Sequence, residues 1–106
     1  MNNVYTPDKW VVLRITYPET NQTIDKVLGA WYGGFAGSDH WQLNSGIKLV
    51  DEHSDRFEFH GYSGSIYVCY KPCWGFTSLS NGIYKSLVTK GVPVQILEEY
   101  DVRPKR

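Results

Sequence analysis

The sequence predicts an α+β fold, in which a curved antiparallel sheet of five or six strands packs against one helix. Three observations lead to this class. Stretches of alternating or mostly apolar residues recur between short polar turns from residue 10 to residue 71. Only residues 77–90 show apolar residues at helical spacing. The length of 106 residues fits a single domain, which we place at residues 1–106.

The first two strands form the clearest pair. Residues 10–17 (Trp-Val-Val-Leu-Arg-Ile-Thr-Tyr) alternate between a fully apolar face and a mixed face, so we expect both faces to be partly covered. Residues 18–22 have the composition of a turn, and a second strand follows over about residues 23–31. The short polar connection predicts an antiparallel hairpin.

Three further strands extend this hairpin into a meander. Residues 46–51 and 56–60 flank a polar connection and predict a second hairpin, preceded by a short strand or turn at 41–43. Residues 66–71 are apolar on both faces, which predicts a central strand that is covered on both sides. A meander needs no long crossover, and its glycine-containing turns allow a barrel-like closure.

The helix is expected over residues 77–90, with Thr77 or Ser78 as its N-cap. Gly82 lies in its middle, where glycine costs about 1 kcal/mol relative to alanine. We therefore expect Gly82 to pack closely on the sheet. Residues 92–100 predict a last strand, which begins late or lies at a sheet edge because it contains a proline.

Composition excludes several classes of function. The formal net charge is zero and no basic stripe precedes the C-terminal tail, so duplex nucleic acid is not an expected partner. No apolar run approaches the roughly 20 residues of a membrane span, and the first residues lack the pattern of a signal peptide. We therefore expect a cytoplasmic protein without a membrane partner. In that compartment Cys69 and Cys73 are expected as free thiols, with a disulfide between them as the alternative.

The most informative stretch runs from Gly29 to Gly46. It holds five of the ten glycines and two of the four tryptophans. Glycine lets a backbone or ligand approach closely, whereas large aromatic side chains are costly to leave in water. Two interpretations stay open: a tightly packed corner whose aromatic residues join the core, or a site for a ligand or partner. The candidate site residues in this stretch are Trp31, Tyr32, Phe35, Gly37, Ser38, Asp39, His40, Trp41 and Ser45.

Three more candidates come from the following hairpin. Ser63 lies in the glycine–serine turn at residues 61–65, and Arg56 and His60 lie at the two ends of the strand before it. Backbone amides around Ser38 are expected to form an anion-binding nest, with serine and arginine side chains as partners. The tryptophans and tyrosines of the loop would then stack on a planar base.

Catalytic and metal chemistry are less favoured. The three histidines, His40, His53 and His60, do not show a recognised metal spacing, so we expect no metal and no cofactor. Ser38-Asp39-His40 contains the residue types of a catalytic triad, but neighbours in the chain rarely point at one another. Cys69 lies in a central strand and is expected to be a small buried apolar residue rather than a nucleophile.

Aromatic residues outside the loop exceed what a single core of short strands can hold. They are Tyr62, Tyr67, Tyr70, Trp74, Phe76 and Tyr100. Tyrosine and tryptophan at a surface are common anchors of protein interfaces, and a net charge of zero permits self-association. These features favour a homo-oligomer formed through sheet edges or an aromatic face.

Three runs of the chain resemble small uncharacterised proteins of tailed bacteriophages. They are residues 5–13 (Tyr-Thr-Pro-Asp-Lys-Trp-Val-Val-Leu), 26–39 (Lys-Val-Leu-Gly-Ala-Trp-Tyr-Gly-Gly-Phe-Ala-Gly-Ser-Asp) and 63–67 (Ser-Gly-Ser-Ile-Tyr). The resemblance covers about residues 5 to 88. It implies a virus-encoded protein acting inside a bacterium, where such accessory proteins often neutralise a host protein or sequester a nucleotide signal of host immunity. It brings no activity, catalytic residue or cofactor with it.

We therefore predict a non-enzymatic binding protein that binds and neutralises a host or defence protein through the glycine- and aromatic-rich loop. The alternative is a sponge for a small, cyclic nucleotide signal, held at an oligomer interface by stacking and a backbone nest. A third hypothesis is a small hydrolase that uses His40 or His60.

Overall fold

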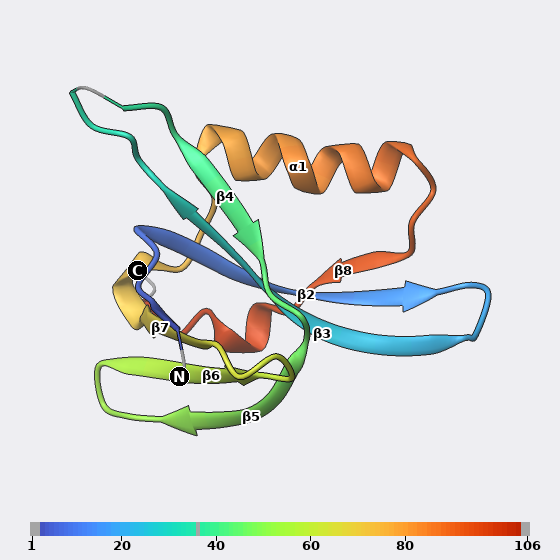
Figure 1. Cartoon of the computed structure of the whole chain (residues 1–106), viewed down its shortest axis with the longest axis horizontal. Helices are drawn as coiled ribbons and strands as arrows, with labels where there is room; N and C mark the ends of the chain where they lie inside the picture. The colour runs from blue at the N-terminus through green and yellow to red at the C-terminus, as the bar shows by residue number, and fades with distance from the viewer. Residues whose placement is uncertain (1–2, 36, 105–106) are drawn as a thin grey trace.

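The computed structural model describes residues 3–35 and 37–104. Within them the chain forms eight strands in two sheets and one α-helix (Figure 1). Sheet A contains, in spatial order, β1 (Val4–Tyr5), β7 (Ile66–Tyr70), β6 (Arg56–Gly61) and β5 (Ile47–Glu52). Sheet B contains β4 (His40–Leu43), β3 (Gln22–Trp31), β2 (Lys9–Tyr17) and β8 (Val94–Ile96). The helix is α1 (Ser78–Thr89), and η1 (Lys71–Cys73) and η2 (Glu98–Tyr100) are single 3₁₀ turns.

The α+β class is confirmed, but the prediction of one curved sheet is wrong, and the two sheets do not close into a barrel. The meander holds within β2–β3–β4 and within β5–β6–β7, and it breaks between β4 and β5. Gly46 makes this break, because its φ of 129° favours glycine and a Cβ there would lie 2.9 Å from Cγ2 of Ile24. The chain therefore turns at Gly46 from sheet B into sheet A.

Sheet B is the middle layer of the molecule. One face packs against sheet A and the other against α1 (Figure 1). Because β2 and β3 alternate, their side chains enter both cores. The core between the sheets contains Trp10, Val12, Val27, Phe57, Phe59, Tyr67 and Cys69. The core beneath the helix contains Val11, Leu13, Ile15 and Leu28, with Ile83, Tyr84 and Leu87 of α1 packed against them. The prediction that both faces of residues 10–17 are covered is confirmed.

Among residues 3–35 and 37–104, no helix covers the outer face of sheet A. Tyr67 and Cys69 of β7 are buried, but Ile66 and Val68 are half-buried and Tyr70 is exposed. The expectation that this strand is covered on both sides is therefore wrong, because α1 lies on sheet B instead.

The two observed cores accommodate more aromatic rings than the single core that the sequence was expected to form. Tyr67 is buried, and Trp74, Phe76 and Tyr100 are half-buried. Of the six aromatic residues that seemed to exceed the core, only Tyr62 and Tyr70 are exposed.

The helix begins where the sequence predicts. Thr77 is its N-cap and forms a capping box with Ser80, in which Oγ1 of Thr77 accepts from the Ser80 amide at 3.1 Å. Gly82 does not pack closely, because no atom lies within 4 Å of the position of a Cβ there. No described helix is long and apolar enough to cross a bilayer.

The ends of the chain differ most from the prediction. The strand expected over residues 92–100 is shortened to β8 and followed by η2, and β8 lies at the edge of sheet B, as its preceding proline favours. Residues 4–5 form β1, which was not predicted and pairs in parallel with β7. Two residues are too few to show an alternating pattern.

Candidate functional site

The twelve predicted site residues fall into three groups in the structure. Eight lie on the loop between β3 and β4 and on the adjoining strand ends: Trp31, Tyr32, Phe35, Gly37, Ser38, Asp39, His40 and Trp41. Ser45 and Ser63 meet at the bend between the two sheets. Arg56 and His60 lie on the outer face of sheet A. The structure therefore does not join all twelve into one site.

The β3–β4 loop and the first residues of β4 carry three exposed aromatic side chains. The loop extends from one end of sheet B, away from the rest of the molecule (Figure 1). Phe35 is fully exposed at 108% of its reference area, and Tyr32 and Trp41 are exposed at 54% and 41%. Only Trp31 is partly buried and packs against the core between the sheets. Of the two interpretations of this stretch, the packed corner therefore applies to Trp31 and not to the other three.

The base of the loop is held in place by several contacts. The rings of Trp31 and His40 stack with centroids 4.9 Å apart and an angle of 4° between their planes. Nε1 of Trp31 donates to the carbonyl oxygen of Thr6 at 3.0 Å. The amide of Tyr32 donates to the Asp8 carboxylate at 2.9 Å. These contacts fix where the two strands leave the sheet.

Above this base, two glycines let the limbs of the loop come together. A Cβ on Gly37 would lie 2.7 Å from the carbonyl oxygen of Gly33, and a Cβ on Gly33 would overlap the backbone of Ser38. The Gly33 amide donates to the Asp39 carboxylate at 2.9 Å across the same neck. Only glycine permits this approach, so the spacing of glycines in this stretch reflects a narrow neck.

The anion-binding nest is expected around Ser38, next to the carboxylate of Asp39. Across the neck, the amides of Tyr32 and Gly33 donate to the carboxylates of Asp8 and Asp39. Two carboxylates beside the amides would repel a phosphate. One face of Trp31 is stacked on His40 and is therefore closed to a base. The loop therefore presents apolar rings at its exposed part and negative charge near its base.

The second group lies at the bend between the sheets. Oγ of Ser45 accepts from the amide of Ser63 at 3.0 Å and lies 3.2 Å from the Ser63 hydroxyl. Next to it, Oδ1 of the buried Asn44 accepts from the amides of Val27 at 2.9 Å and Gly46 at 3.2 Å. Nδ2 of Asn44 has no hydrogen-bond partner among the described residues. Sequence reasoning missed Asn44, because an asparagine in a polar turn has no distinctive pattern.

An open cleft of about 760 Å³ begins at this bend. It is lined by Arg14, Gln22, Thr23, Ile24, Asp25, Ser45, Ile47 and Tyr62. Nε and Nη2 of Arg14 donate to the two oxygens of Asp25 at 2.8 and 3.1 Å. This hydrogen bonding raises the pKa of Arg14 above its usual value. Of the predicted site residues, only Ser45 lines this cleft.

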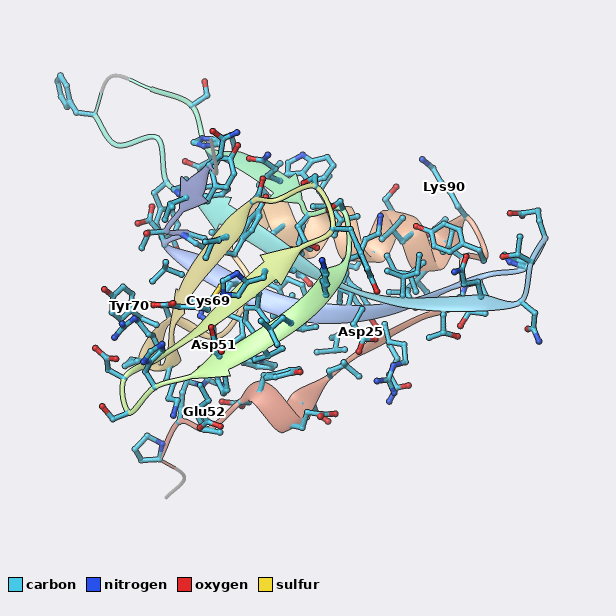
Figure 2. All side chains as sticks on the ribbon, turned by 60° about the horizontal axis from the view of Figure 1, so that its bottom comes forward. Asp25, Asp51, Glu52, Cys69, Tyr70 and Lys90 are labelled. Carbon is cyan, nitrogen blue, oxygen red and sulfur yellow. The ribbon has the colours of Figure 1, made fainter. Side chains whose placement is uncertain are left out.

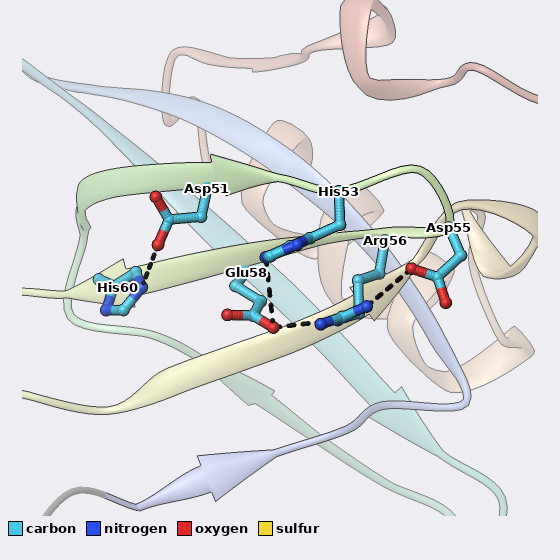
Figure 3. Close-up of polar contacts among 6 residues, drawn as sticks. All are labelled: Asp51, His53, Asp55, Arg56, Glu58 and His60. Atoms are coloured by element: carbon cyan, nitrogen blue, oxygen red, sulfur yellow. Dashed lines mark hydrogen bonds and ion pairs between the residues drawn. The ribbon is translucent and has the colours of Figure 1, made fainter.

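The third group belongs to a row of polar side chains on β5, β6 and the turn between them, which form two separate sets of contacts (Figure 3). Nε2 of His60 lies 3.1 Å from Oδ2 of Asp51. Glu58 accepts from Nε of Arg56 at 2.9 Å and lies 3.5 Å from Nε2 of His53. Nη1 of Arg56 also donates to Asp55 at 2.8 Å, so the predicted role of Arg56 as a partner of the loop would require it to leave Glu58 and Asp55.

Three of these side chains have the types of ligand atom that a cation site needs. Ligand atoms of Asp51, Glu58 and His60 lie within 4.8 Å of one another. Carboxylate oxygens and an imidazole nitrogen are ligands that divalent transition metals accept. Arg56 already holds one oxygen of Glu58, so a metal ion would compete with its guanidinium group.

The hydrolase hypothesis needs a nucleophile beside a histidine. Among the described residues, no serine or cysteine forms a hydrogen bond with His40 or His60. Cys69 is buried, and burial raises its pKa well above the usual value for a thiol, so it stays protonated. Cys69 and Cys73 are both free thiols, as predicted.

No family model, curated protein or solved structure matches the chain. Its function must therefore be argued from its own residues.

Proposed function

We propose that the chain is a non-enzymatic binding protein that captures a partner protein with its β3–β4 loop. The observation that carries this proposal is Phe35, a fully exposed phenyl ring on a loop whose base is fixed by hydrogen bonds and a ring stack. Burying such a ring in a partner yields about 2–3 kcal/mol. An exposed ring on a fixed base is therefore suited to fill an apolar pocket of a partner.

The construction of the loop suits this role. Hot spots of protein interfaces are rich in aromatic anchors, and Tyr32 and Trp41 lie near Phe35 in the chain. A base that is already ordered lowers the entropy lost on binding. The carboxylates of Asp8 and Asp39 lie at the base. We therefore expect a partner with an apolar pocket for one ring and basic or amide groups around it.

The resemblance to bacteriophage accessory proteins identifies the partners to test first, which are proteins of the bacterial host and its defence systems. A nucleotide ligand has less support, because two carboxylates lie at the neck of the loop and one face of Trp31 is covered by His40.

The test begins with native mass spectrometry of the chain purified from a bacterial host. A co-purified protein would be identified, produced separately and titrated against the chain by calorimetry. We expect Phe35→Ala to weaken this binary complex by roughly thirtyfold, which corresponds to the loss of one buried ring. Tyr70→Ala is the matched control, because Tyr70 is an exposed aromatic residue on sheet A.

Two outcomes would contradict the proposal. If Phe35→Ala and Tyr70→Ala bind the partner equally well, the loop is not the anchor. If the chain instead retains a mass of a few hundred daltons that Trp41→Ala releases, the nucleotide sponge is the better account.

A further inference from the structure

Half of β3 lacks a neighbour on its outer edge. β4 pairs only with Leu28–Trp31, and Asn44 extends this contact by one residue to Val27. Among residues 3–35 and 37–104, no strand pairs with this edge between Gln22 and Lys26. The other edge of the same segment is fully paired with β2.

The direction of the backbone groups on this edge follows from Val27. Its amide donates to Oδ1 of Asn44 at 2.9 Å, and its carbonyl oxygen accepts from the Asn44 amide at 3.0 Å. In an antiparallel ladder, alternate residues turn both backbone groups to the same side. Thr23 and Asp25 therefore direct their N–H and C=O groups outward, whereas those of Ile24 and Lys26 point toward β2.

The charges that usually protect a free edge are engaged elsewhere. Both oxygens of Asp25 accept from Arg14, and the Lys26 ammonium group lies over the Tyr17 ring at 5.9 Å. The segment contains no proline, and its register with β2 is continuous. It therefore lacks a proline and a bulge, two of the features by which proteins commonly prevent edge pairing.

The cleft lies beside this edge. In Figure 2, the β2–β3 arm that carries Asp25 extends to one side of sheet A. Thr23 and Asp25 line the cleft from β3, and Ile47 and Tyr62 line it from sheet A. The Tyr62 side chain is two-thirds exposed, at 67%. In a strand added to β3, the residues opposite Thr23 and Asp25 would place their side chains on the face that these two share. Arg14 and Asp25 line the cleft from this same face, so side chains of the added strand would point toward the cleft.

We propose that the outer edge of β3 from Gln22 to Lys26 binds an extended peptide segment of a partner protein as an added strand, with an apolar side chain seated against Ile47 and Tyr62. Backbone hydrogen bonds to Thr23 and Asp25 supply the affinity, and the cleft supplies the preference for an apolar side chain. This site lies at the opposite end of β3 from Phe35 and uses none of the same residues. Either proposal can therefore fail without the other.

The experiment measures amide hydrogen exchange by NMR on the full chain. The probe is a peptide about five residues long with blocked ends and the sequence Thr-Leu-Thr-Leu-Thr, whose alternation suits a half-buried strand. In the free chain, we expect the amides of Thr23 and Asp25 to exchange quickly and those of Ile24 and Lys26 slowly. Addition of the peptide is expected to slow Thr23 and Asp25 roughly tenfold, and to shift the ring resonances of Tyr62.

Two variants separate the edge from the cleft. Thr23→Pro removes the outward N–H without removing a hydrogen bond to β2, and we expect it to weaken peptide binding roughly tenfold. Tyr62→Ala tests the seat of the apolar side chain, and serves as a second variant if Thr23→Pro folds poorly. Thr23→Ala and Phe35→Ala are the controls and should bind the peptide as the original chain does.

Three results would overturn the proposal. The first is unchanged exchange at Thr23 and Asp25 at millimolar peptide. The second is peptide binding that survives both Thr23→Pro and Tyr62→Ala. The third is a dimer in analytical ultracentrifugation that Thr23→Pro dissociates, because the occupant of the edge would then be a second copy of the chain.

Discussion

Aromatic rings between the two sheets pack against one another, whereas those of the β3–β4 loop lie in solvent. Phe57 and Phe59 lie 5.6 Å apart, and the Tyr100 ring meets each of them edge-on at 5.3 Å. Among the described residues, the rings of Tyr32 and Phe35 contact no other aromatic ring.

The difference between these two regions shows that residue type does not decide the role of a ring. In β6 the alternation of the strand directs Phe57 and Phe59 into the core. In the loop, the glycine neck brings the two limbs together and leaves no inner surface to cover Phe35. The same kind of side chain thus supports stability in one region and stays available for a partner in the other.

The largest effect expected from this comparison is on the free energy of unfolding. Phe59→Ala should lower it by about 3–5 kcal/mol, because a fully buried ring is replaced by a cavity. Phe35→Ala should change it by less than about 0.5 kcal/mol, because the ring is already in water. Urea denaturation of both variants measures this contrast, and similar losses in the two would refute the assignment of roles.

Asn44→Ala tests the bend that lies between the two regions. The amides of Val27 and Gly46 would lose their acceptor in a buried place, so we expect a loss of about 2–3 kcal/mol. Ser45→Ala is the matched control, because it removes only exposed hydrogen bonds to Ser63 and should cost about 0.5 kcal/mol. Equal destabilisation in the two variants would show that Asn44 does not hold the bend.

A pH series tests Tyr67, which is buried in the core between the sheets. Burial raises the pKa of Tyr67 to about 12, above the usual value for a phenol, so the neutral form favours the native state. Its contribution is complete below about pH 10 and is lost as the pH rises from about 10 to 12, by roughly 2 kcal/mol. Tyr67→Phe should remove this part of the pH dependence in urea denaturation between pH 9 and 12. If the free energy of unfolding depends on pH in the same way in Tyr67→Phe and the original chain, the assignment to Tyr67 is wrong.

The smallest effect is expected at the base of the loop. His40→Ala removes the ring stacked on Trp31, and we expect it to lower the free energy of unfolding by about 0.5–1 kcal/mol. Its local effect should be clearer, with faster hydrogen exchange at the Gly33 amide. His53→Ala, which replaces a histidine on the far side of sheet A, should leave that amide unchanged.

Local patterns in the sequence predicted most of the elements but not their arrangement. Alternation located β2, β3, β5, β6 and β7, and the capping residue Thr77 located the helix. Short turns also predicted the hairpins β2–β3 and β5–β6, but none of these signals says which hairpins share a sheet. The break at Gly46 depends on a positive φ and on contact with Ile24, both of which are properties of the assembled sheets.

The candidate sites show the same division. Glycine and aromatic composition predicted the β3–β4 loop, because both residue types are visible in the sequence. The edge of β3 at Thr23 and Asp25 was not predicted, because a backbone group is free only where no other strand reaches it. The free edge exists because β4 ends at Leu43, and no local pattern in the sequence predicts this end.

The order in which the ribosome releases the chain gives β8 a particular importance. β8 pairs with Leu13–Ile15 of β2, and Leu97, just after β8, is buried in the core between the sheets. A nascent chain therefore cannot complete sheet B or close its core until Leu97 has left the ribosome. A product that stops before Val94 would expose an unpaired edge of β2 and an open core. We expect chaperones and proteases to act on such a product.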